Sequence, residues 1–311
     1  MAVSRTVIGV ASAFGGGVSF SVNDVVIKFL SGGYPLHQLV LMRAVIAALI
    51  VVLVLMPLAG GLHHIRTRRL GAHVLRALFV VASNVCYFLA LAAMPIAEAV
   101  ALFFIAPLLI TAFSVVFLGE TVGPRRWTAV AIGLVGVIVM LRPGTEAFQP
   151  AALLCLASAA FYAGMHMFTR RMGVTEAAVT FALYVQLTFI VTAGAVGIAL
   201  GDGRLAGSED PSLAFLFRAW IWPPAADWWL IAAIGLSSGI GGFLVAQAYK
   251  LVDAGLAAPF EYISLPMAVV WGVVVFGEFP DAFAWAGIAL ILGSGLYMMW
   301  REAQIARRGG G

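Results

Sequence analysis

The chain has 311 residues, of which 63% are hydrophobic and 10% are charged, and its mean hydropathy is +1.05. A soluble globular protein of this length could not bury so much apolar surface, so the composition excludes a water-soluble domain and indicates a membrane protein. The net charge of +4 does not point to a nucleic-acid partner, because the basic residues gather at predicted helix ends, where membrane topology explains them.

Ten apolar runs, each long enough to cross a bilayer, follow one another along the chain. A hydrocarbon core about 30 Å thick requires roughly 20 apolar residues per helix. Short polar or Gly- and Pro-rich breaks separate the runs. The pattern predicts transmembrane helices over 6–30, 36–58, 72–93, 96–118, 124–141, 150–171, 177–200, 228–250, 256–276 and 281–300. We therefore expect an all-α polytopic membrane protein.

The first apolar run predicts a retained helix rather than a cleaved signal peptide. It is longer than the apolar core of a typical signal peptide, and it carries Asn23, Asp24 and Lys28 near its far end. Asp24 and Lys28 are four residues apart, which predicts an ion pair within this helix near the outer surface.

Lysine and arginine residues are distributed unequally between the two sides of the predicted bundle. With ten spans, both termini and the even-numbered connections share one side, and 13 of the 18 basic residues fall there. The positive-inside rule therefore predicts that both termini are cytoplasmic.

Two six-residue stretches nearly repeat each other at a distance of 158 residues. VVFLGE at 115–120 corresponds to VVVFGE at 273–278, and a tryptophan follows each stretch at the same spacing, Trp127 and Trp285. Each Gly-Glu alone could be no more than a helix stop. Together they predict that the chain consists of two copies of a five-helix unit, 1–145 and 146–311.

An odd number of helices per copy has a topological consequence. The second copy must enter the membrane from the opposite face, so Glu120 is expected on the cytoplasmic side and Glu278 on the outer side. We thus expect ten transmembrane helices as two inverted five-helix repeats, an arrangement typical of secondary transporters, with the substrate between the repeats near the midplane. This arrangement favours alternating access over an open channel.

Prolines in the middle of the fourth and ninth predicted helices mark expected kinks or hinges. Pro107 and Pro266 each remove one helical hydrogen bond and free the carbonyl four residues earlier, that of Phe103 or Tyr262. A bare carbonyl cannot face lipid, so these kinks should face protein or a watery cavity. Taken singly, each could be an ordinary packed kink.

These features resemble the drug/metabolite transporter superfamily with paired EamA-type domains, and most closely the YddG-type bacterial exporters of aromatic amino acids. The resemblance covers nearly the whole chain and rests on the repeated Gly-Glu together with Asn23, Lys28, Arg43, Pro107 and Pro266. It implies a multi-pass transporter of the bacterial inner membrane that exports aromatic amino acids. The second half departs from the first, with Arg170 where a lysine is expected and no clear counterpart of Arg43.

Polar and aromatic side chains at membrane depth are the candidates for substrate binding. Asn84 and Tyr87 are three residues apart, and Tyr162 and His166 four apart, so each pair shares a helix face. Polar groups could hold the ammonium and carboxylate of an amino acid, while aromatic rings could stack on its side chain. The alternative for each polar residue is an interhelical hydrogen bond worth about 0.6 kcal/mol. The candidates are Asn84, Tyr87, Phe103, Tyr162, His166, Phe243, Gln247, Glu261 and Trp271.

Glu261 is the carboxylate of most interest, because an unpaired charge would be costly two turns inside the ninth helix. It either pairs with a cationic group of the substrate or is protonated at neutral pH, which makes protons a coupling partner to test.

An enzyme is the competing interpretation. Residues 235–239 satisfy the G-x-S-x-G string around Ser237, and His166 lies on another helix, as in intramembrane serine proteases. That string belongs to a strained strand-to-helix turn, however, and here it falls in an apolar helix rich in small residues. No metal-protease, nucleotide-binding or paired-cysteine motif is present, so we expect no cofactor and no metal.

Overall fold

The computed structural model describes residues 5–67, 69–172, 177–252 and 260–309, and these residues form helices without any strand. The first half contains α1 (Arg5–Leu30), α2 (Leu36–Ile50), the π-helix η1 (Val51–Leu55), α3 (Met56–Leu58), the 3-10 helix η2 (Leu62–Ile65), α4 (Leu70–Ala93), α5 (Ile96–Phe103), α6 (Ala106–Leu118) and α7 (Pro124–Leu141). The second half contains α8 (Ala151–Met172), α9 (Ala178–Leu200), α10 (Pro211–Phe217), the 3-10 helix η3 (Ala225–Asp227), α11 (Trp228–Leu251), α13 (Ser264–Trp271), the π-helix η4 (Gly272–Phe276) and α14 (Ala282–Gly309).

The predicted membrane architecture is confirmed. Nine helical stretches among the described residues are long and apolar enough to span a membrane, and Ser264–Phe276 is a shorter apolar helix at the position of the ninth predicted span. The first residues of that predicted span, 256–259, lie outside the described residues. Helix α10 was not expected. Asp210 caps it by accepting a hydrogen bond from the Leu213 amide.

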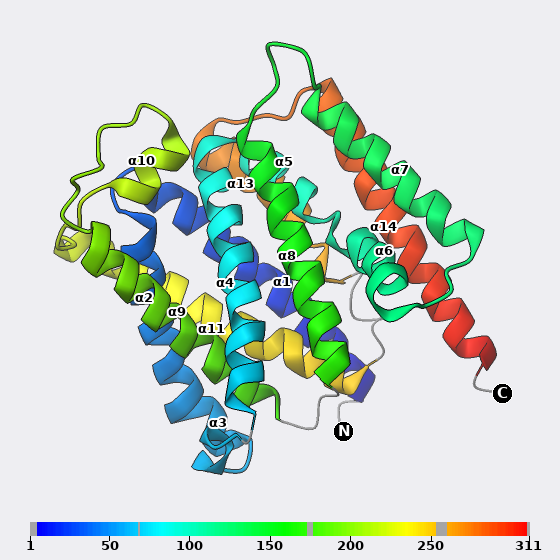
Figure 1. Cartoon of the computed structure of the whole chain (residues 1–311), viewed down its shortest axis with the longest axis horizontal. Helices are drawn as coiled ribbons and strands as arrows, with labels where there is room; N and C mark the ends of the chain where they lie inside the picture. Colours follow the sequence, from blue (N-terminus) through cyan, green and yellow to red (C-terminus); the bar gives the residue numbers. More distant parts are fainter. Residues whose placement is uncertain (1–4, 68, 173–176, 253–259, 310–311) are drawn as a thin grey trace.

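The bundle has two ends (Figure 1). We call the end at which α1 begins and α14 ends the terminal end; α3 and η2 also lie there. We call the opposite end the far end; it holds α10 and the connections 142–150 and 277–281.

Helices from the two halves pair in a pattern that an exchange of the halves leaves unchanged. Helix α1 packs against α11 and α4 packs against α8, so the first helix of each half lies against the third helix of the other. Helix α2 contacts α9, and α7 contacts α14, which pairs the second helices and the fifth helices. Figure 1 shows α7 and α14 side by side at one edge of the bundle.

Glycines allow the closest of these approaches. A Cβ atom on Gly136 would lie 2.8 Å from Leu290 Cβ, and one on Gly287 would lie 2.8 Å from the Gly136 carbonyl oxygen. The α7–α14 contact therefore requires small residues on both helices, as is common in membrane bundles.

The repeated sequence forms a repeated backbone structure. Gly119 and Gly277 end their helices with the same left-handed φ of 68°. The Glu120 amide donates to the Ser114 carbonyl at 3.2 Å, and the Glu278 amide donates to the Gly272 carbonyl at 2.8 Å. Both helices thus end at a glycine, which tolerates the left-handed conformation.

Both proline-containing helices are interrupted at corresponding places. The fourth span breaks at Phe104 and Ile105, between α5 and α6, and the ninth breaks at Tyr262 and Ile263, just before α13. The expected interruptions are therefore present. The Tyr262 carbonyl, which Pro266 frees from its helical hydrogen bond, accepts from the Leu265 amide at 3.0 Å, as expected for the alternative of a packed kink. A tighter turn at the break satisfies the group without a cavity.

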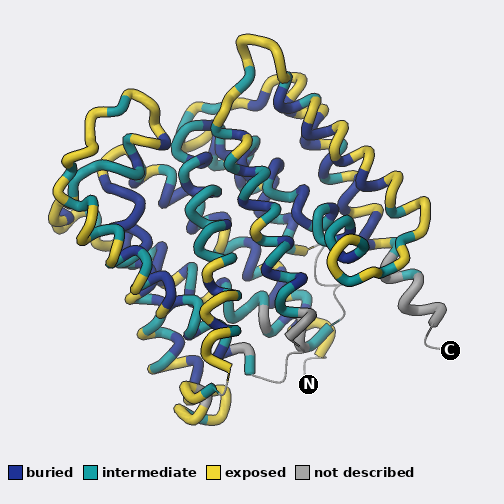
Figure 2. Tube along the Cα trace, in the orientation of Figure 1, coloured by how far each residue is buried: buried dark blue, intermediate teal, exposed yellow. Residues whose placement is uncertain are grey.

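The buried core follows α1, α2, α4 and α5, whereas exposed residues mark the outer faces of α7 and α14 and the connections (Figure 2). The exposed positions include large apolar side chains such as Ile198, Val116 and Val274. Apolar outward faces are expected where helices meet lipid rather than water.

Candidate substrate-binding site

A row of aromatic rings joins three helices in the interior of the bundle. Tyr87 of α4 lies 5.3 Å from Phe103 of α5 between ring centroids, and Phe103 lies 5.4 Å from Tyr162 of α8. His166, one turn after Tyr162, extends the row at 4.7 Å. These spacings are typical of attractive tilted and edge-to-face contacts. The structure thus brings four of the predicted site residues together.

Arg43 of α2 forms a polar centre beside this row. Its Nη2 atom donates to Asn84 Oδ1 at 3.3 Å, and its Nη1 atom donates to Asn23 Oδ1 at 3.4 Å. Its guanidinium carbon lies 5.1 Å from the ring centroid of Phe88 and 5.1 Å from that of Phe189. Two rings and two amide oxygens therefore surround a cation that is only 3% exposed.

Asp24 connects the polar centre to the aromatic row. The Tyr87 hydroxyl donates to Asp24 Oδ2 at 2.8 Å. The predicted ion pair between Asp24 and Lys28 is wrong, because Lys28 pairs instead with Glu278 at 2.9 Å. Asp24 accordingly faces inward toward α4.

The two helix breaks meet at a stacked pair of rings that we did not predict. Phe104 and Tyr262 lie 4.3 Å apart between centroids, at an interplanar angle of 19°. The two residues are 158 positions apart, the same offset that relates Glu120 to Glu278. The prolines of the two helices are 159 positions apart, however, so the sequence repeat pairs Tyr262 with Phe103 and gave no signal for this contact. The Glu261 carboxylate lies near enough to the hydroxyls of Tyr162 and Tyr262 to act on both electrostatically.

Three other predicted site residues occupy different surroundings. Trp271 donates from Nε1 to Ser21 Oγ of α1 at 3.0 Å. Phe243 packs against a small cluster around Val51 and Leu55, beside η1, rather than joining the aromatic row. Gln247, one turn after Phe243 on α11, is partly buried.

Ser237 does not have the geometry of a hydrolase nucleophile. It lies within the continuous helix α11, where its hydroxyl donates to the Ile234 carbonyl at 3.2 Å and accepts from Asn23 Nδ2 at 3.4 Å. A nucleophile elbow would instead place the serine on a sharp turn between a strand and a helix. Ser237 is therefore a packing residue that helps to hold Asn23.

Residues 7–142 match the model of the EamA-like transporter family. We call residues 7–142 the EamA-like domain after this match. Helices α1 to α7, with Arg43, Asn84, Tyr87 and Phe103, lie within this domain or at its edges.

Named relatives extend the likeness beyond the EamA-like domain into the second half. A riboflavin transporter of Vibrio cholerae is 28% identical over 295 residues, 94% of this chain and 93% of that protein. An S-adenosylmethionine uptake transporter of Rickettsia felis is 27% identical over 293 residues, 94% of this chain and 92% of that protein. The pseudopaline exporter CntI of Pseudomonas aeruginosa is 27% identical over 288 residues, 91% of this chain and 93% of that protein. All three relatives are named as transporters or exporters.

The fold has also been seen in a solved structure. One crystal structure matches with a TM-score of 0.64 over 97% of this chain and 99% of that one, at 21% identity. At that identity the match establishes the fold alone.

At the far end, an ion pair between Lys28 and Glu278 joins the EamA-like domain to the second half. The Lys28 ammonium donates to the carbonyl of Met94 at 2.6 Å while it contacts Glu278 Oε1 at 2.9 Å. Glu278 Oε2 accepts from the Ile96 amide at 3.1 Å. The cation thus caps the end of α4, and the anion caps the start of α5, as the helix dipoles favour.

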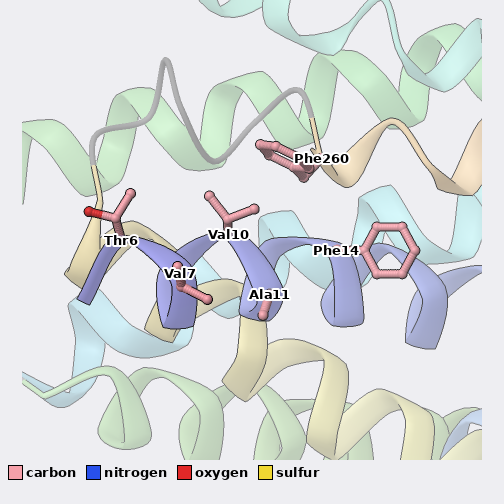
Figure 3. A pocket seen from close by; sticks show the side chains of 6 residues that line it. All are labelled: Thr6, Val7, Val10, Ala11, Phe14 and Phe260. Atoms are coloured by element: carbon pink, nitrogen blue, oxygen red, sulfur yellow. The ribbon is translucent and has the colours of Figure 1, made fainter. Parts of the chain in front are cut away.

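An apolar hollow of about 410 Å³ lies at the terminal end of α1, away from the polar centre. Figure 3 shows Phe260 facing Val10 across it. Its lining consists of Thr6, Val7, Val10, Ala11, Phe14 and Phe260. Because Thr6 is the one polar side chain that the described residues contribute to this lining, the hollow suits an alkyl chain better than a polar metabolite.

Proposed function

We propose that the protein is a secondary transporter that moves a small metabolite across the bacterial inner membrane by alternating access. The EamA-like domain and the transporter relatives support the transport class. In this proposal the repeats 1–145 and 146–311 cross the membrane in opposite senses, and the terminal end is cytoplasmic. The excess of basic residues at that end supports the orientation.

The observation that carries the proposal is the meeting of the two broken helices at the Phe104–Tyr262 stack. Secondary transporters built from inverted repeats bind substrate where discontinuous helices meet at the repeat interface. Here the rings of Phe104 and Tyr262, one at each helix break, are in contact. Phe103, the neighbour of Phe104 in the sequence, belongs to the aromatic row. A substrate at this place would touch both halves.

For the substrate, we propose an aromatic amino acid, and export as the direction of transport. The aromatic row could hold the ring, and the nearby polar groups could hold the charged headgroup. The direction comes from the resemblance to YddG-type exporters; the named relatives include uptake transporters as well as an exporter. Riboflavin is a second candidate, favoured by the likeness to the Vibrio cholerae riboflavin transporter.

Glu261 is the residue through which we propose to test coupling to protons. If it binds a proton or a cationic group of the substrate, Glu261→Gln should change the transport rate or its pH profile. An unchanged rate and profile would remove Glu261 from the site.

Counterflow in proteoliposomes tests the function. Purified protein would be reconstituted, and uptake of labelled Phe, Trp, Thr, a nucleobase, riboflavin and S-adenosylmethionine would be measured with and without a pH gradient. We expect counterflow of Trp and Phe. Counterflow of riboflavin alone would replace the substrate while keeping the transport class, and no counterflow of any compound would contradict the proposed function.

A further inference from the structure

Asp24 is a carboxylate within a membrane-spanning helix, and no cation among the described residues is in contact with it. It takes part in none of the ion pairs Lys28–Glu278, Arg142–Asp281 and Arg204–Asp202. Its hydrogen bond comes from the neutral Tyr87 hydroxyl. Ionisable groups at membrane depth are costly to keep without a partner, and they commonly mark a substrate or ion site.

Arg43 is the complementary case, a buried cation without an anion in contact. Its two hydrogen bonds to amide oxygens, at 3.3 and 3.4 Å, are longer than the 2.7–2.9 Å typical of a guanidinium bound to a carboxylate. Its Nε atom is buried, and no acceptor among the described residues contacts it. A buried donor without an acceptor calls for an explanation, and a missing ligand is one of the standard explanations.

The two opposite charges are neighbours that do not touch. Arg43 is close enough to attract Asp24 electrostatically, but no nitrogen of Arg43 comes within 4.0 Å of the Asp24 carboxylate. Asn23 and Asn84 hold the guanidinium, and Tyr87 holds the carboxylate. Asn23 is in turn fixed to the Ile234 carbonyl of α11 at 3.1 Å, so both halves of the protein help to hold the charges apart.

We propose that Asp24 and Arg43 recognise the headgroup of an aromatic α-amino acid, Asp24 accepting from its ammonium and Arg43 donating to its carboxylate. The inference rests on the proposed transport function and names its substrate class. An α-amino acid carries both charges on one carbon, so its site needs an anion and a cation that are close but not already paired. The ring of Tyr87, whose hydroxyl contacts Asp24, begins the aromatic row. The substrate ring would therefore lie along Phe103 and Tyr162.

Equilibrium binding of three related ligands tests the proposal on the unaltered protein. Isothermal titration of purified protein would compare L-tryptophan with tryptamine, which lacks the carboxylate, and with indole-3-propionate, which lacks the ammonium. We expect each analogue to bind about tenfold or more weakly than tryptophan, because each loses one charge-assisted contact. Equal affinities for the three ligands, or no binding of tryptophan, would overturn the proposal.

Two variants then assign the charges. Asp24→Asn should weaken tryptophan and tryptamine about tenfold or more and leave indole-3-propionate unchanged. Arg43→Lys, which keeps the charge but loses the planar fork, should weaken tryptophan and indole-3-propionate and leave tryptamine unchanged. Asp281→Asn, which breaks the Arg142–Asp281 pair at the far end, is the matched control and should leave all three unchanged.

A uniform loss of affinity for all three ligands in either variant would indicate a structural role and overturn the assignment. If a variant does not fold, the ligand series on the unaltered protein still decides. Tryptophan binding without counterflow would contradict the proposed function while supporting this site. Riboflavin counterflow without tryptophan binding would support the proposed transport function and contradict this site.

Discussion

The repeat makes two connections equivalent, yet they are built differently. The connection 59–69 joins the second and third helices of the first half, and 201–227 joins those of the second half. Among its described residues the first connection contains the short η2, and Leu62 within it is 55% exposed. The Tyr184 hydroxyl of α9 donates to the Ile65 carbonyl of this connection at 2.9 Å.

The connection 201–227 is fastened to several helices. The Arg218 guanidinium donates to the Ser31 carbonyl at 2.6 Å, and the Ser212 hydroxyl donates to the Leu89 carbonyl at 2.8 Å. Gln38 donates to the Ile221 carbonyl at 2.6 Å and accepts from the Ile221 amide at 3.3 Å. Phe215 of α10 is completely buried. This connection holds together the far ends of α1, α2 and α4.

The difference indicates where the protein can rearrange. Helices joined by several buried contacts move as a unit, because packed interiors are rigid. The far ends of α1, α2 and α4 should therefore stay together during transport. The elements left to move during transport are the two broken helices. These are α5 with α6, and residues 260–263 with α13.

The largest expected effect is the loss of Phe215. Phe215→Ala should lower the free energy of unfolding by about 3–5 kcal/mol, because it removes a fully buried ring. Leu62→Ala in the other connection should change it by less than about 0.5 kcal/mol. SDS-titration unfolding in mixed micelles measures both. Equal costs would mean that the two connections are not different in kind.

The second-largest loss of stability is expected from the removal of the Arg218 guanidinium. Arg218→Ala should cost about 1–3 kcal/mol in the same measurement, because a partly buried guanidinium stops donating to the Ser31 and Tyr34 carbonyls. Arg218→Lys should recover part of the loss. A cost within error of zero would show that the 31–34 turn is held by other contacts.

The repeated helix ends should behave alike, in contrast to the connections. Gly119→Ala and Gly277→Ala should each cost about 1–2 kcal/mol, because both glycines have a φ of 68° and neither has a neighbour within 4 Å of the added Cβ. The test is whether the two substitutions lower the free energy of unfolding by the same amount. A difference well beyond error would contradict the structural equivalence of the two helix ends.

The smallest expected effect is a dependence of stability on pH through Asp281. The pKa of Asp281 is lowered from 3.8, first by the hydrogen bond from the Ala284 amide and then by Arg142, so its contribution to stability is present above pH about 3.8 and lost as pH falls below it. Asp281→Asn should therefore be less stable than the unaltered protein at pH 6 and approach it at lower pH. The equivalent position in the first half is Gly123, which has no carboxylate. A stability difference that does not shrink as the pH falls below about 3.8 would exclude this ionisation as its cause.

The sequence predicted the membrane helices closely because a bilayer requires long apolar runs. The expected 124–141 is α7 without change, and the expected 228–250 differs from α11 by one residue. Helix α10 was missed because its seven residues are too short for a membrane-spanning pattern. Whether the repeat boundary lies between 145 and 146 stays a prediction.

For the site, helical spacing grouped Asn84 with Tyr87 and Tyr162 with His166, but spacing within one helix cannot show which residues meet across helices. The partners of Asp24 and Lys28 are 63 and 250 residues away in the sequence, so the nearby charge four residues along was a misleading guide. The Phe104–Tyr262 stack was not detectable from the repeat, because the prolines of these two helices are 159 positions apart and pair Tyr262 with Phe103.

Thiol labelling from the two sides of the membrane tests the inverted repeat most directly. Thr121 and Phe279 are exposed and 158 residues apart, and they follow the two Gly-Glu pairs. Thr121→Cys and Phe279→Cys would be made separately in a background with Cys86→Ala and Cys155→Ala, and treated with a membrane-impermeant maleimide on intact and on opened cells. We predict that Phe279→Cys is labelled in intact cells and that Thr121→Cys is labelled only after opening. Labelling of both from the same side would contradict the inverted repeat and the shared site between its halves.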